Sequence, residues 1–209
     1  IEDDVGIGGA NYIFTHGSWQ SQLDGFPVSF GAVHIKKGVW FPWRVFVMPN
    51  VTVGEYATIG AGSIITKDIP ARSLAAGSPA KVLRTEEQYI KRHTDDEKDG
   101  MVRKMLTEYA EFQAFKGERQ VRVEDANGTL IIHDGEASVR YARAMNELPA
   151  ERIATYLGPL SQEQRTALTV AGKSWFDILG RTSRHSTARG WQDVRDFFSR
   201  YGVRFNIED

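Results

Sequence analysis

The residue best suited to catalysis in this sequence is His16, which follows Thr15 at the mouth of a break in an otherwise regular pattern. An imidazole accepts and releases protons near neutral pH, so a histidine can act as the base that activates a hydroxyl or an amine. A lone surface histidine more often has no such role. The elements around His16 therefore decide how it is interpreted.

The pattern around His16 is a six-residue repeat. Neither the period of an α-helix nor that of a β-strand gives a repeat of six, whereas a short extended segment followed by a turn does. The same frame occurs earlier, at Ile1, Ile7 and Ile13. We expect the first position of each hexad to point inward, and from residue 35 onward it is occupied by Ile35, Phe41, Val47, Val53, Ile59 and Ile65. A second set stands four places later in each hexad: Val39, Val45, Val51, Ala57, Ser63 and Ile69.

Three such hexads would make one coil with only three large inward side chains. Burying each side chain yields roughly 1.5–3 kcal/mol, whereas ordering the backbone costs about 1–2 kcal/mol per residue. A single coil cannot stand alone, so coils must stack. We therefore expect further coils before Ile1 in the natural protein, or neighbouring subunits that cover the flanks.

The repeat breaks after the hexad that starts at Ile13 and resumes at Ile35, so residues 18–34 are predicted to be a loop that leaves the coil. His16 occupies the fourth place of its hexad, where side chains face outward. Long loops on a rigid scaffold often carry function. Aromatic residues beside polar ones suit a sugar, and the predicted acceptor contacts in this loop are Trp19, Gln20, Asp24 and Phe26.

The composition excludes several other classes of function. Lys and Arg number 26 against 27 Asp and Glu, a net charge of -1 that gives no reason to expect a nucleic-acid partner. The absence of cysteine excludes disulfides, thiolate metal sites and a cysteine nucleophile, and it fits the cytoplasmic location that we expect. No apolar run reaches the ~18 residues of a membrane span, so no integral membrane segment is predicted.

The order of Thr15-His16, a loop, and the segments VHIKKGVW, GAGSIITKDIP and AAGSPAKVLR resembles the hexapeptide-repeat acyltransferases that act on galactosides, maltose and xenobiotics. The resemblance implies a mainly β fold, with a left-handed parallel β-helix of hexapeptide repeats. It also implies a homotrimer with active sites between subunits, acetyl-CoA or another acyl-CoA as co-substrate, no metal, and His16 as general base. The acceptor would be a hydroxyl or amine of a sugar or glycan precursor in polysaccharide biosynthesis.

The resemblance further implies which residues contact the acyl donor: Trp40, Trp43, Ala61, Gly62, Thr66, Lys67, Ser78, Lys81 and Arg84. One departure concerns this side of the site. Pro42-Trp43 replaces a glycine and a small residue of the relatives. The added indole could narrow the donor channel, stack on the acceptor, support the loop, or simply pack.

The resemblance covers residues 1–84 well and the remainder poorly. We expect a helical connector at 85–117, broken within residues 94–100, and a small α+β domain of unknown role at 118–209. In that domain we predict a hairpin around Asn127-Gly128, strand structure over residues 169–178 and a helix over residues 191–201. Two alternatives stay open: a non-catalytic scaffold that binds a partner, and a γ-carbonic-anhydrase-like enzyme, which needs three imidazoles around zinc.

Overall fold

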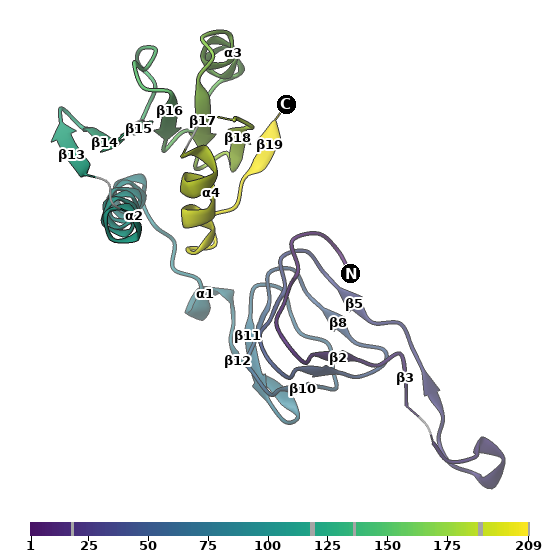
Figure 1. Ribbon diagram of the computed structural model, residues 1–209. Helices are drawn as coiled ribbons and strands as arrows, with labels where there is room; N and C mark the ends of the chain where they lie inside the picture. The colour runs from purple at the N-terminus through teal and green to yellow at the C-terminus, as the bar shows by residue number, and fades with distance from the viewer. Residues whose placement is uncertain (18, 118–119, 136, 188–189, 209) are drawn as a thin grey trace. The chain divides into compact units, whose positions relative to one another are not determined.

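The structure is a computed structural model that describes residues 1–17, 19–117, 120–135, 137–187 and 190–208. Ser18, the first residue of the predicted loop 18–34, lies outside the described residues. The chain divides into two compact units, Ile1–Arg92 and His93–Asp209; the first consists mainly of short β-strands, and the second combines a β-sheet with helices (Figure 1). The two units are described separately.

The first unit is a coil of very short parallel strands that occupy three faces in turn. Face one contains β1, β6, β9 and β11, face two contains β2, β7 and β10, and face three contains β5 and β8. The strands are β1 Gly6–Ile7, β2 Tyr12–Ile13, β5 His34–Ile35, β6 Trp40–Phe41, β7 Phe46–Val47, β8 Thr52–Val53, β9 Thr58–Ile59, β10 Ile64–Ile65 and β11 Leu74–Gly77.

The register between neighbouring strands shows that one coil contains three hexads. His34 pairs with Thr52, Trp40 with Thr58 and Phe46 with Ile64, so each pair is separated by three hexads along the chain. The loop lengthens this spacing in the first coil, where Tyr12 pairs with Phe46, and the spacing is shorter in the last coil, where Thr58 pairs with Leu74. The strands of each face therefore stack in register.

The inward positions predicted from Ile35 onward are all buried. Both sets of six residues, from Ile35 to Ile69, lie in the interior of the coil. In the first coil, by contrast, Ile1 is 73% exposed and Ile7 46% exposed. The inward side chains of this coil are covered from one side only, by the coil that starts at Ile35.

The corners of the coil depend on one left-handed residue per hexad. Positive φ angles between 54° and 72° recur at Gly38, Arg44, Asn50, Tyr56 and Gly62. Glycine adopts this conformation without cost, whereas each residue with a side chain pays about 1–2 kcal/mol for it. Packing of the coil core therefore imposes the corner geometry even where the local residue does not favour it.

Two antiparallel hairpins depart from this coil. The loop begins as the hairpin of β3 His16–Gly17 and β4 Ser29–Phe30, with a short 3₁₀ helix, η1 Gln22–Asp24, between them. Figure 1 shows this hairpin extending away from the coil. At the other end, β12 Ala80–Arg84 folds back on β11 and widens face one, and α1 Glu86–Tyr89 follows.

The second unit is a seven-stranded mixed sheet with helices. Its strands lie in chain order, and β15, β16 and β17 are parallel to one another. The elements are α2 Asp95–Lys116, β13 Val121–Ala126, β14 Thr129–Asp134, β15 Ala137–Ala142, β16 Ile153–Tyr156, α3 Gln162–Val170, β17 Ser174–Asp177, β18 Thr182–Arg184, α4 Trp191–Ser199 and β19 Asn206–Glu208.

Several predictions for this half of the chain need correction. The expected connector 85–117 is divided, because α1 belongs to the first unit and α2 packs into the core of the second through Val102, Leu106 and Tyr109. The break between the helices lies before Thr94, whose side chain caps α2, rather than within residues 94–100. Part of the expected strand over 169–178 is the end of α3.

The hairpin around Asn127-Gly128 and the helix from Trp191 are confirmed. Both turn residues have positive φ, as a two-residue hairpin requires. None of the helices among the described residues combines the length and hydrophobicity of a bilayer-crossing segment.

Candidate active site

His16 lies where the chain leaves face two and enters the loop hairpin. It pairs with Phe30 in the β3–β4 ladder, and the two rings stack with centroids 6.1 Å apart and planes 25° from parallel. The imidazole is exposed and lines a cavity of about 540 Å³. This placement fits the outward orientation predicted for the fourth place of the hexad.

Two of the four predicted acceptor contacts share this cavity with His16. Trp19 and Gln20 line it, whereas Asp24, in η1, and Phe26 lie farther out on the exposed hairpin and do not. The structure thus brings an aromatic ring and an amide beside the imidazole. An aromatic face next to polar groups can hold a sugar ring and its hydroxyls.

Phe14 and Met48 also line the cavity, although neither is among the predicted site residues. They come from neighbouring coils and are adjacent because the Phe14 N–H donates to the Val47 carbonyl at 2.9 Å. The stacking of coils therefore predicts Met48 as a neighbour of Phe14, once the shift introduced by the loop is known. Their apolar side chains make this part of the cavity wall nonpolar.

Three of the predicted donor contacts lie at a different corner, between face one and face two. This first corner contains residues 8–11, 42–45 and 60–63, so Trp43, Ala61 and Gly62 belong to it. The Gly62 N–H donates to the Trp43 carbonyl at 2.9 Å. Ser78 is next to the corner, because the Gly77 N–H donates to Ser63 Oγ at 3.1 Å. Gly62 has open space where a Cβ would stand, so the backbone there is accessible.

The contacts of Trp43 bear on the four interpretations of its indole. A Cβ built on Gly9 would lie 2.5 Å from the Trp43 ring, and one on Gly8 would lie 2.0 Å from the Pro42 carbonyl oxygen. Pro42 and Trp43 therefore pack on two glycines of the preceding coil. The ring is still 64% exposed. Trp40 packs on Gly6 in the same way, on the outside of face one.

The remaining predicted donor contacts do not gather at the first corner. Lys81 and Arg84 are exposed on β12, at the edge of the sheet that includes face one. Thr66 and Lys67 are exposed at the second corner, between face two and face three. The second corner also carries His16, because Phe14, Met48 and Thr66 follow the strands of face two in successive coils.

The predicted catalytic base and the small-residue part of the donor site are thus on opposite margins of face two. The outer surface of this face is apolar: Tyr12, Phe14 and Phe46 stack with planes within 17° of one another, and Ile64 continues the row above them. Face three carries polar residues instead, including the Glu2–Lys36 ion pair at 2.8 Å. One copy of the chain does not bring the two margins together.

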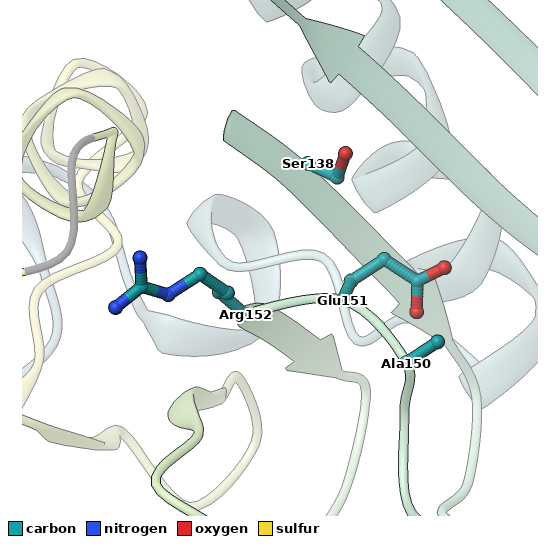
Figure 2. Close-up of a pocket in the computed structure, with 4 residues that line it drawn as sticks. All are labelled: Ser138, Ala150, Glu151 and Arg152. Carbon is teal, nitrogen blue, oxygen red and sulfur yellow. The ribbon is translucent and has the colours of Figure 1, made fainter. Parts of the chain in front are cut away.

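The second unit offers a smaller cavity of about 270 Å³, lined by Ser138, Ala150, Glu151 and Arg152 (Figure 2). Glu151 and Arg152 extend in opposite directions, so these charged groups do not converge on a common ligand (Figure 2). The Glu151 carboxylate lies instead 3.8 Å from Arg140. In the described part of the chain, no three His, Cys, Asp or Glu side chains are grouped as metal ligands would be.

Comparison with known proteins relates part of the chain to acetyltransferases. No family model matches. A protein of Staphylococcus aureus (strain COL) that is provisionally named an acetyltransferase is 47% identical over 74 residues, 35% of this chain and 37% of that protein. Galactoside O-acetyltransferase of Escherichia coli (strain K12) is 43% identical over 63 residues, 30% of this chain and 29% of its own length. The chain therefore matches about a third of the length of these relatives.

Among solved structures, a maltose O-acetyltransferase from Clostridium difficile 630 is 32% identical with a TM-score of 0.37, over 43% of this chain and 47% of that one. A galactoside acetyltransferase in complex with coenzyme A is 31% identical with a TM-score of 0.36, over 44% and 49%. Over the 63 to 74 residues that align, this chain is similar by sequence to hexapeptide-repeat acetyltransferases such as galactoside O-acetyltransferase.

Proposed function

We propose that this protein transfers an acyl group, most simply acetyl from acetyl-CoA, to a hydroxyl or amine of a sugar or glycan precursor, with His16 as general base. The observation that carries the proposal is the His16 imidazole in a cavity that also contains Trp19 and Gln20. The relation to galactoside O-acetyltransferase supports the same chemistry. The left-handed winding of the coil is part of this proposal.

The reaction needs a base because hydroxyl and ammonium groups are poor nucleophiles at neutral pH. His16 would take the proton of the acceptor as its oxygen or nitrogen attacks the thioester carbonyl carbon. Backbone N–H groups would stabilise the tetrahedral oxyanion. The carbon–sulfur bond then breaks, and the coenzyme A thiolate leaves and takes up a proton. The transfer is direct, so no acyl-enzyme is required.

The donor would lie along the first corner, where small residues let a ligand approach the backbone. Gly62 and Ala61 are exposed there, and Trp43 presents one face of its indole beside them. Trp40, Ser78, Lys81 and Arg84 extend this surface over face one and β12, and the two cations suit the phosphates of coenzyme A. Thr66 and Lys67, at the second corner, would meet a donor bound to a neighbouring copy.

A complete site would require a second copy of the chain. His16 and the Trp43–Gly62 segment are on opposite margins of face two, and the aromatic row between them leaves an apolar surface uncovered. Packing face two of one copy beside a neighbour would bury this row and bring the second corner of one copy to the first corner of the next. We therefore propose a homotrimer with sites between subunits.

The test is an acetyl-CoA transfer assay with a panel of sugars, glycan intermediates and amines, comparing wild type with His16→Ala. Loss of a general base lowers kcat by about 10²–10⁴-fold. His34→Ala is the matched control, since His34 is also exposed and also stands in a two-residue strand, on face three. A folded His16→Ala protein that transfers at the wild-type rate would remove the proposed base.

A further inference from the structure

The imidazole of His16 has one ring neighbour, and it comes from the other strand of the hairpin. Phe30 stands directly opposite in the β3–β4 register, which sets the two rings 6.1 Å apart and nearly parallel. Among the residues that the structure describes, none hydrogen-bonds to the imidazole. The Phe30 ring is therefore placed to restrain the plane of the His16 ring.

Phe30 is held in place at the base of the hairpin. The Gly31 N–H donates to the Thr15 carbonyl at 2.8 Å, which closes the ladder beside His16. Gly31 also lies against the second corner, since a Cβ at this position would stand 1.9 Å from Asn50 Oδ1. At the tip of the hairpin, Leu23 is 99% exposed.

Stacking is an effective way to orient a base because it uses only the face of the imidazole. Both ring nitrogens lie in the ring plane, so a parallel neighbour leaves each nitrogen free to accept or hold a proton. A freely rotating histidine would spend much of its time with neither nitrogen directed at the acceptor. Misplacing a catalytic group by about 1 Å can cost about 10²-fold in rate.

We propose that Phe30 is a positioning residue for His16: it holds the imidazole plane so that one nitrogen faces the cavity next to Trp19 and Gln20. This inference rests on the proposed function for its effect on rate. The outer face of the Phe30 ring remains open, and the whole side chain is 75% exposed. A direct role in binding the acceptor is the competing interpretation, and kinetics separate the two.

The kinetic test compares Phe30→Ala with the conservative Phe30→Tyr and with Leu23→Ala, a control on the same hairpin that does not line the cavity. We expect Phe30→Ala to lower kcat about 10- to 100-fold while both KM values stay within about twofold of wild type. Phe30→Tyr should restore kcat, and Leu23→Ala should leave it unchanged. A raised acceptor KM with unchanged kcat, or no effect at all, would overturn the proposal.

A second measurement does not depend on activity. In wild-type protein the His16 ring protons, assigned by their loss in His16→Gln, should be shifted upfield by the Phe30 ring current in proton NMR spectra. The shift should disappear in Phe30→Ala and persist in Phe30→Tyr. An upfield shift in a wild-type protein that shows no transferase activity would refute the proposed function. Absence of the upfield shift in an active enzyme would refute the role of Phe30.

Discussion

The buried carboxylate of Asp177 allows a direct test of which interactions stabilise the second unit. Asp177 ends β17 and is fully buried. Its two oxygens accept hydrogen bonds from the Leu160 N–H at 2.8 Å, the Gly180 N–H at 2.7 Å and Arg165 Nη2 at 3.2 Å. One side chain thus joins the end of β17 to the segment before α3 and to the turn before β18.

Replacing Asp177 with alanine removes the acceptor of three hydrogen bonds, of which the one from Leu160 is buried and those from Gly180 and Arg165 are partly buried. A buried donor that loses its partner costs about 1–3 kcal/mol, and breaking a buried ion pair costs about 3–5 kcal/mol. These costs overlap rather than add. Arg165 keeps a second acidic partner, Glu208, at 2.6 Å, so its charge is not left alone. We therefore expect Asp177→Ala to reduce the free energy of unfolding of the second unit by about 3–4 kcal/mol.

Hydrogen exchange followed by mass spectrometry measures this loss separately in each unit. Protection of peptides from β16, α3 and β17 should fall by roughly two to three orders of magnitude, while peptides from the coil should keep their protection. Asp193→Ala is the control, because Asp193 forms an exposed pair with Lys116 that is worth about 1 kcal/mol or less. A loss below about 1 kcal/mol in Asp177→Ala, or an equal loss in the coil, would refute this reasoning.

Three further predictions concern the coil, its assembly and the response of the second unit to pH. Phe41→Ala removes a fully buried ring from the coil and should cost about 3–5 kcal/mol, measured by urea denaturation; retention of wild-type stability would mean that the coil core is not as described. Tyr12→Asp, at a half-exposed position on face two, should lower the mass in sedimentation equilibrium to that of one chain, while His34→Asp on face three should not. Burial raises the pKa of both Tyr156 and Tyr141, and Tyr141 also donates to Asp99. Both hydroxyls therefore keep their protons longer in the folded state, so their contribution is complete below about pH 10 and is lost as the pH rises further. Thermal unfolding of the second unit should shift to lower temperature above that pH, less steeply in Tyr141→Phe, and an upward shift would contradict the assigned sign.

The relation between sequence and structure differs between the two units. In the coil, inward side chains recur with a period that no helix or single strand shares. Burial of the two periodic sets of residues between Ile35 and Ile69 could therefore be predicted position by position. In the second unit, helices and strands alternate with ordinary periods, and residues 169–173 were assigned to a strand although α3 and its C-terminal turn occupy them. Short apolar segments there fit either element, and only packing on the sheet decides between them.

The sequence alone determined the repeat, the loop that interrupts it and the outward position of His16, because a strict local period fixes the direction in which each side chain points. Tertiary structure decided what each of these residues touches. The packing of Trp43 on Gly9 joins two coils, and the contact of Phe30 with His16 joins two strands. Packing of the coil core also decided the positive φ angles at Arg44 and Tyr56. Face two separates the two margins of the site. Such contacts depend on how far the loop shifts the register of the first coil and on which aromatic ring lies beside which. A local sequence pattern specifies neither the shift nor the neighbouring ring.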